Sequence, residues 1–470
     1  MYQKMTDRFI EEHKEDMLED LKRLIRINSV KGEALPGKPF GEGPAQVLAE
    51  AAKLISGYGF SVTNYDNYAI TADFSEKEKQ LDILAHLDVV PVSPQDWTVT
   101  QPFEPKIQDG KIYGRGPADD KGPAIAAIYA MRAVKECGIE LEKSVRLILG
   151  SDEESGSDDL KYYFCKEVEA PMTFTPDANF PVINTEKGRL EKAFTKAFTE
   201  EFTLPEIIEF HSGTAVNIVP AKASAVVRGL SLETVEQAAL KDQSGVLYVL
   251  TADADTVTIE AKGLAAHAST PEKGNNALCG LLELLSALPL ANTERTKAFR
   301  TVAGWFPRTD YVGAGLGVAM EDEVSGALTM NLGKLDYDGK KLTGVFDSRI
   351  PVCGSDENVT RVIERSFAEA GFSYAEGDMI PVHYVPADSE LVQSLLASYE
   401  RYTGIKGEPI AIGGGTYVHG LERGVAFGCE IEGVDNHMHG DDEFMDIDVL
   451  VMSAKIFADA IIRLCGAVSR

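Results

Sequence analysis

Five short segments of this sequence place acidic residues or histidines after apolar runs or before a helical pattern. They contain His86-Leu87-Asp88, Asp119-Asp120, Glu153-Glu154, Pro176-Asp177 and His437–Glu443. Adjacent carboxylates beside buried strands are costly unless a cation or a proton lies between them. Carboxylate and imidazole ligands without thiolates are typical of catalytic sites for zinc, manganese or cobalt. Taken together, the five segments predict a metal-dependent catalytic centre.

The first segment places a histidine and a carboxylate on one side of the chain. His86 and Asp88 are two residues apart, so on an extended chain they point the same way. A histidine that binds a metal often donates its other ring N–H to a carboxylate, and Asp88 is placed for this role. Taken alone, a buried and hydrogen-bonded histidine without a metal explains the segment equally well.

Two further segments can each be interpreted in more than one way. The stretch Gly114–Gly122 lacks the spacing of a phosphate-binding loop or a dinucleotide fingerprint. A tight turn that places Asp119 near a helix N-terminus is therefore favoured. The stretch Ser151–Asp159 lacks the spacing of an EF-hand loop, and an isolated stretch of this kind is usually a solvated acidic loop. It is the combination of segments that favours a functional site.

A mostly parallel α/β sheet is predicted to position these side chains. Apolar runs alternate with helical patterns in residues 1–185, at Leu81–Ala85, Ala124–Glu136, Val145–Leu149 and Met172–Phe174. In open α/β sheets, ligands bind beyond the carboxyl ends of the strands. Because the polar residues follow the apolar runs, we expect them to meet at that edge.

The pattern changes near residue 186 and returns near residue 386. The middle part alternates strand-like and helical segments, at Thr256–Ala261, 277–288, Ala327–Leu332 and 356–370. The last part resumes the α/β pattern with a helix at 388–403, a strand at Val425–Ile431 and a helix at about 447–465. The sequence predicts an α/β catalytic domain, with a mixed, mostly parallel sheet flanked by helices, from residues 1–185 and 386–470. An α+β lid domain at 186–385 is inserted into it.

Composition limits the classes of partner. The 470 residues include 46 basic and 74 acidic side chains, a formal net charge of −28, which repels nucleic acid and anionic membranes. The N-terminal segment is a charged amphipathic helix rather than a signal peptide, and no apolar stretch is long enough to span a bilayer. Six scattered cysteines indicate a reduced, cytoplasmic protein.

The order of the motifs carries a family resemblance. HLDVVP, GRGPADDKGP, GSDEESG, TPDA and HGDDE closely resemble the binuclear metallopeptidase family of carboxypeptidase G, aminoacylase and carnosinase. The length of the chain, its inserted domain and its GGGTY segment are most similar to those of PepV-type bacterial dipeptidases. The resemblance implies two divalent metal ions, held by the residues that match the family's ligands: His86, Asp119, Glu154, Asp177 and His439. In this scheme Asp119 bridges the ions and is joined to Asp120 by a cis peptide bond.

The resemblance also implies roles outside the ligand set. Glu153 matches the general base, and His267 matches the histidine that stabilises the tetrahedral intermediate. Asn217 and Arg349 match substrate-binding residues. The loop with Gly414 and Gly415 exposes backbone N–H groups suited to a peptide carboxylate, although a flexible turn explains it equally well. Pro117 and His419 depart from the residues usual at these positions, which affects the expected substrate preference.

The implied function is that of a metal-dependent dipeptidase. Such a hydrolase cleaves dipeptides or very short peptides through a bridging water activated by two metal ions, with zinc expected first and manganese or cobalt as alternatives. N-acyl amino acid deacylases and aminotripeptidases use the same chemistry and remain the alternative. A non-catalytic binding protein is disfavoured, because it would be expected to lose the base or a ligand. The inserted domain supplies within one chain what dimeric relatives take from a partner, so a monomer is expected.

Overall fold

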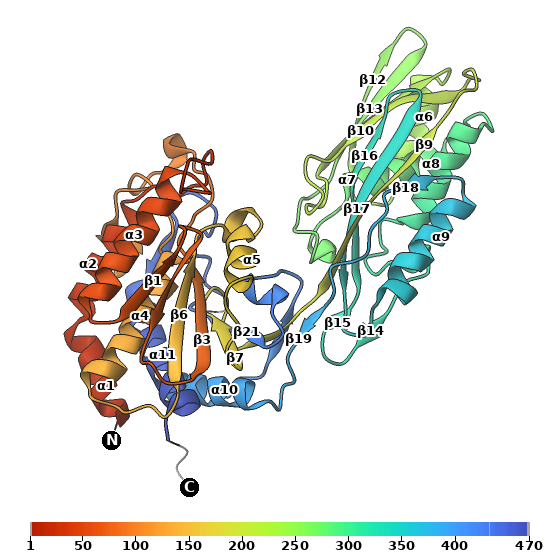
Figure 1. The fold of residues 1–470 in the computed structure, drawn as a ribbon. Helices are drawn as coiled ribbons and strands as arrows, with labels where there is room; N and C mark the ends of the chain where they lie inside the picture. The colour runs from red at the N-terminus through yellow and green to blue at the C-terminus, as the bar shows by residue number, and fades with distance from the viewer. Residues whose placement is uncertain (1, 432, 468–470) are drawn as a thin grey trace. The chain divides into compact units, whose positions relative to one another are not determined.

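The chain folds into two compact units, which are described separately (Figure 1). The computed structural model describes residues 2–431 and 433–467. Unit 1 consists of Met1–Thr185, His383–Ile410 and Gly415–Arg470, and unit 2 of Glu186–Val382 and Ala411–Gly414. No helix among the described residues combines the length and the apolar character that crossing a membrane requires.

A mixed sheet of nine strands forms the centre of unit 1. Its order is β1-β2-β6-β3-β7-β21-β8-β19, with β20 also paired to β8. The strands are β1 (Ser61–Tyr65), β2 (Ala69–Asp73), β3 (Lys79–His86), β6 (Ser144–Gly150), β7 (Met172–Thr175), β8 (Ile183–Glu186), β19 (His383–Tyr384), β20 (Ile410–Ile412) and β21 (Gly424–Ala426). The pairs β6–β3, β3–β7 and β7–β21 are parallel, and β1–β2, β2–β6 and β21–β8 are antiparallel.

Helices cover both faces of this sheet. On one face α4 (Lys121–Glu136) and α11 (Ile447–Cys465) pack on β3 and β6, and α1 (Tyr2–Glu12), α2 (Lys14–Ile25) and α10 (Glu390–Thr403) pack against these two helices. Near the first edge, α3 (Glu42–Gly57) packs on β1 and β2. On the other face, α5 (Asp158–Phe164) and the short helix η6 (Tyr417–Gly420) join a separate apolar cluster. Because β3 and β6 are covered on both faces, they are almost continuously buried.

A small antiparallel sheet ties two distant segments of unit 1 together. It consists of β4 (Lys106–Gln108), β5 (Lys111–Tyr113) and β22 (Phe444–Asp446), in the order β22-β5-β4. The loop before β22 carries His439, and the loop after β5 carries Asp119. The pairing of β22 with β5 therefore brings these two loops near each other.

Unit 2 is an antiparallel sheet with helices packed on it. The strand order is β12-β13-β11-β10-β16-β17-β9-β18. The strands are β9 (Gly188–Ala197), β10 (Glu206–Ser212), β11 (Lys222–Arg228), β12 (Leu247–Asp253), β13 (Thr256–Lys262), β16 (Thr329–Tyr337), β17 (Lys341–Ile350) and β18 (Ser373–Tyr374). The helices are α6 (Leu232–Ala239), α7 (Ala277–Ala287), α8 (Glu294–Trp305) and α9 (Arg361–Glu369). Buried and exposed residues alternate along β11 and β13, as expected for a sheet with one covered face.

Short elements complete the two units. Unit 1 contains the 3-10 helices η1 (Pro94–Asp96) and η2 (Glu153–Ser155). Unit 2 contains η3 (Pro271–Lys273), η4 (Ala314–Leu316), the π-helical η5 (Asp356–Thr360) and a hairpin of β14 (Glu321–Asp322) and β15 (Gly326–Ala327).

The predicted fold class is confirmed, an α/β catalytic domain with an inserted α+β lid domain, and three elements differ in detail. The N-terminal helix is divided into α1 and α2, and the predicted helix at 356–370 begins with the π-helical turn η5. The predicted strand Val425–Ile431 ends at Ala426. Beyond it the chain follows the loop after β7, where a side chain at Gly428 would lie 1.7 Å from the Ala178 oxygen.

Candidate active site

The carboxyl ends of three parallel strands bring the first group of predicted site residues together. His86 is the last residue of β3, Glu153 and Glu154 lie in η2 directly after β6, and Asp177 follows β7 by two residues. Because β6, β3 and β7 are adjacent and parallel, their carboxyl ends share one edge of the sheet. Asp119 reaches this edge from the loop before α4.

Asp119 lies between the two histidines. Its Oδ1 is 2.9 Å from His86 Nε2, and its Oδ2 is 2.8 Å from His439 Nε2. Asp177 Oδ2 is 3.6 Å from His86 Nε2, and Glu154 Oε1 is 3.3 Å from His439 Nε2. The side chains therefore form two groups that share one carboxylate.

The donor set fits divalent cations. His86 Nε2 is buried and forms no hydrogen bond within the described residues, although two carboxylates lie close to it. Its Nδ1 lies 3.1 Å from the main-chain oxygen of Asp88, which can only accept, so Nδ1 carries the proton. Nε2, which faces the carboxylates, is therefore the nitrogen that would bind a metal. Ligand atoms lie within 4.8 Å of one another in two sets, His86–Asp119–Glu154 and His86–Glu153–Asp177.

The protonation states of the site's histidines and carboxyl groups reflect the crowding of negative charge. Contacts with Asp119 and Glu154 raise the pKa of His439 to about 10. Burial acts to raise the pKa of the Asp119 carboxyl, yet contacts with His439 and His86 hold it below its usual value. Burial also raises the pKa of the Asp177 carboxyl. Without metal ions, protons on the imidazoles supply the positive charge that the carboxylates require.

Glu153 and Asp88 are connected through the backbone of η2. The Asp88 carboxylate accepts hydrogen bonds from the main-chain N–H groups of Glu153 and Glu154, each at 3.1 Å. Its Oδ1 is 3.5 Å from His86 Nδ1, so the imidazole is held mainly by the Asp88 main-chain oxygen. Burial, with nearby carboxylates, raises the pKa of Glu153 well above its usual value. A buried carboxyl group of this kind is suited to holding a proton near neutral pH.

Four charged residues around this centre were missed as functional candidates by sequence reasoning. Asp120 accepts a hydrogen bond from the His86 N–H at 2.9 Å, and its peptide bond to Asp119 is cis. Lys121 is fully buried and donates to the main-chain oxygens of Leu24 and Ile27 at the end of α2. Arg115 and Glu443 form a buried ion pair. The feature of the sequence that could have revealed these residues is the concentration of charged side chains next to glycines and to the apolar helix α4.

Unit 2 contains all but one of the other predicted site residues. The His267 segment pairs with the Asn217 segment, since Ala268 N donates to Asn217 O at 2.9 Å. Arg349 is buried, forms two hydrogen bonds with Asp347, and donates to Gly413 O at 2.6 Å. Gly414 belongs to the same unit, and Gly415 begins the next segment of unit 1.

The protonation state of His267 follows from its neighbours. Ser269 N donates to His267 Nδ1 at 3.1 Å, so in the neutral ring Nδ1 is the acceptor and Nε2 carries the proton. Burial, and then the charge of Arg349, lowers the pKa of His267. The neutral ring therefore offers one N–H donor.

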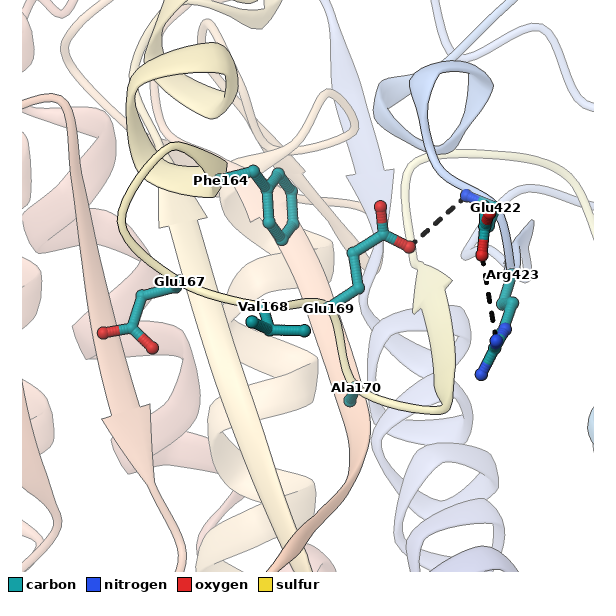
Figure 2. A pocket seen from close by; sticks show the side chains of 7 residues that line it. All are labelled: Phe164, Glu167, Val168, Glu169, Ala170, Glu422 and Arg423. Atoms are coloured by element: carbon teal, nitrogen blue, oxygen red, sulfur yellow. Dashed lines mark hydrogen bonds and ion pairs between the residues drawn. The ribbon is translucent and has the colours of Figure 1, made fainter.

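One pocket of unit 1 lies away from these residues. Figure 2 shows this cavity of about 380 Å³. It is lined by Phe164, Glu167, Val168, Glu169, Ala170, Glu422 and Arg423. These residues precede β7 and β21, whereas the candidate ligand Asp177 follows β7. The pocket is thus at the opposite edge of the sheet and contains none of the predicted site residues.

Comparison with known proteins identifies the family. The sequence model of peptidase family M20/M25/M40 matches residues 83–463. The chain belongs to this family. This M20-family member is a peptide hydrolase, and the family implies divalent metal ions, which agrees with the donor set at the sheet edge.

Relatives of this M20-family chain match it along almost its whole length. It is 37% identical over 462 residues to the putative dipeptidase YtjP of Bacillus subtilis (strain 168), covering 96% of this chain and 97% of the relative. It is 34% identical over 466 residues to the Beta-Ala-Xaa dipeptidase of Lactobacillus delbrueckii subsp. lactis, covering 97% of each. Human carnosine dipeptidase 1 shares the fold, with a TM-score of 0.58, 16% identity and 99% of each chain covered.

Proposed function

We propose that this chain is a metal-dependent dipeptidase that hydrolyses dipeptides or very short peptides. The observation that carries the proposal is the convergence of His86, Asp119, Glu154, Asp177 and His439 beside Glu153 at one edge of the sheet. Two relatives of matching length are named as dipeptidases. The converging side chains and the names of these two relatives together favour hydrolysis of the amide bond of small peptides.

The residues of the chain suit the steps of this reaction. Divalent cations held by the five ligands would lower the pKa of a coordinated water and polarise the scissile carbonyl. Glu153, whose pKa is raised by burial, accepts the proton of the water and returns it to the leaving amine. The Nε2–H of neutral His267 is a donor suited to a developing oxyanion. Asn217, Arg349 and the backbone N–H groups of Gly414 and Gly415 are proposed to bind the peptide.

We further propose zinc as the physiological metal, with manganese and cobalt as substitutes that use the same ligands. The six cysteines are all unpaired, which supports a cytoplasmic location. A monomeric state is proposed because unit 2 lies within the same chain, and light scattering would measure it.

A substrate panel tests the proposal. The metal-loaded protein is assayed with α-dipeptides, β-alanyl dipeptides, tripeptides, and N-acetyl and N-succinyl amino acids, with chelator-treated protein as control. Hydrolysis of dipeptides that is lost on chelation and restored by Zn²⁺ is the expected result. Activity confined to the acylated amino acids would replace the dipeptidase assignment with a deacylase, and activity confined to tripeptides would replace it with an aminotripeptidase.

A further inference from the structure

The loops that carry Asp119 and His439 are joined by one buried carboxylate, that of Glu443. Glu443 Oε1 accepts hydrogen bonds from the main-chain N–H groups of Gly116 at 3.1 Å, Ala118 at 3.0 Å and Asp119 at 3.3 Å. Its Oε2 accepts from Arg115 Nη1 at 2.5 Å. Glu443 is fully buried, so each of these hydrogen bonds forms away from water, where a lost partner is costly.

Arg115 extends the connection to the other loop. Its Nη2 donates to the main-chain oxygen of Gly440 at 2.8 Å, one residue after His439. The Gly114 N–H also donates to the Glu443 main-chain oxygen at 3.1 Å. In all of these contacts the loop before α4 donates the hydrogen bond and the segment before β22 accepts it.

We infer that Glu443 is a positioning residue that sets the distance between the Asp119 carboxylate and the His439 imidazole. It acts on the cation that Asp119, Glu154 and His439 would share. The inference rests on the metal dependence in the proposed function. Asp119 and His439 are 320 positions apart in the sequence, and Glu443 bonds to the N–H of Asp119 itself. A shift of either loop would change the 2.8 Å separation of Asp119 Oδ2 from His439 Nε2.

The neighbouring acid makes a different contact and provides a matched control. Asp442 lies in the same loop, but its carboxylate accepts hydrogen bonds from Thr98 N at 2.9 Å and Val99 N at 2.8 Å. It therefore anchors the loop without touching the segment that carries Asp119. A purely stabilising role for the loop would make the two acids equivalent, whereas a positioning role makes only Glu443 affect metal binding.

The test measures binding of Co²⁺ alone to the full chain, without substrate. Wild-type protein, Glu443→Gln, Glu443→Asp and Asp442→Asn are stripped of metal and titrated with Co²⁺ against a competing chelator. Circular dichroism and the melting temperature of the metal-free proteins report folding. For Glu443→Gln we expect the affinity for one of the two ions to fall about 10–100-fold. Losses of this size are typical when a residue that hydrogen-bonds to a metal ligand is replaced. The ion nearer His86 and Asp177 should be retained, and Asp442→Asn should bind both ions as the wild type does.

Each outcome decides the inference. A folded Glu443→Gln chain that binds both ions with wild-type affinity overturns it, as does an equal loss in Asp442→Asn. If Glu443→Gln does not fold, Glu443→Asp, which keeps the charge beside Arg115 but shortens the side chain, decides in the same way. A wild-type chain that binds fewer than two ions also overturns it. Failure of the proposed function is distinct, because a wild-type chain that binds two ions but hydrolyses no peptide would leave the Glu443 result standing.

Discussion

Individual side chains in the candidate site differ in which of their atoms are held by hydrogen bonds and which remain available to bind a metal or a proton. His86 Nδ1 is engaged by the Asp88 main-chain oxygen, and its Nε2 lacks a hydrogen bond within the described residues. Glu153 has its main-chain N–H fixed by Asp88, while its carboxyl group has a pKa raised by burial. These contacts suit the imidazole to the predicted role of metal ligand and the glutamate to the predicted role of proton carrier.

Replacing Glu153 should separate catalysis from metal binding. The Glu153→Ala variant removes the carboxyl group that would move the proton, a function that contributes about 10²–10⁴-fold to the rate. We expect kcat to fall by that order while the metal content, measured by elemental analysis, stays near that of the wild type. A variant that retains most of its rate would show that another group is the base. Loss of both metal ions would instead indicate that Glu153 is a ligand.

Metal binding should release protons at neutral pH. In the metal-free chain, contacts with Asp119 and Glu154 raise the pKa of His439 to about 10, so its imidazole is charged at pH 7.5. An imidazole must be neutral to bind a metal, so binding displaces this proton and the apparent affinity rises with pH, by about tenfold per pH unit for each proton released, until the pH passes that pKa.

Calorimetry in buffers of different ionisation enthalpy counts these protons. At pH 7.5 we expect wild-type protein to release at least about one proton for each pair of ions bound. His439→Asn should release fewer. His437→Asn is the control, because His437 Nδ1 contacts the main-chain oxygen of Asp441 instead of a candidate ligand. Binding without proton release would contradict the protonated state of His439.

At the scale of elements, close packing at the start of α4 fixes the loop that carries Asp119. A side chain at Gly122 would place its Cβ 2.0 Å from the main-chain oxygen of Pro117. Glycine is therefore required at this position by the approach of two backbone segments. The helix and the loop cannot separate without moving Asp119, which lies between them in the sequence.

The Gly122→Ala substitution should destabilise the fold. We expect the free energy of unfolding to fall by about 1–3 kcal/mol, because the methyl group must displace backbone atoms. Gly57→Ala, at the end of α3 with no atom within 4 Å of the added Cβ, is the control. It should be neutral or stabilise by up to about 1 kcal/mol. Urea unfolding measures both, and equal effects would show that the contact with Pro117 is not limiting.

At the scale of the whole molecule, the candidate metal ligands all belong to unit 1. His86, Asp119, Glu154, Asp177 and His439 lie within its three segments. The predicted peptide-binding residues His267, Asn217 and Arg349 lie in unit 2. The predicted metal ligands and these three predicted peptide-binding residues thus lie in different compact units of the chain.

Hydrogen exchange should show this division when metal is added. A ligand that binds only the folded state stabilises it, and here it would stabilise the segments around its ligands. We expect Zn²⁺ to slow exchange at the loops near residues 86–88, 114–120, 152–156, 176–180 and 436–443, and to leave 188–380 unchanged within error. Mass spectrometry of peptic fragments measures this, and protection spread evenly over both units would contradict it.

The residues that could bind metal, and their order along the chain, were predictable from the sequence. His86, Glu154 and Asp177 follow apolar runs that are short and clearly bounded, so the local pattern was sufficient to predict three strands whose carboxyl ends share an edge of the sheet. The choice of His439 over His437 depended on family resemblance, because spacing alone does not show which imidazole faces Asp119.

Only the tertiary structure decided how the parts of the site support one another. The Asp88 carboxylate holds the N–H groups of η2, β21 ends at Ala426, and Glu443 bonds to the N–H of Asp119 across 324 positions of sequence. Local patterns report which face of a strand or helix is apolar, since that depends on neighbouring residues. They carry no information on which buried polar group meets another from a distant loop, because those contacts are set only when the whole chain has packed.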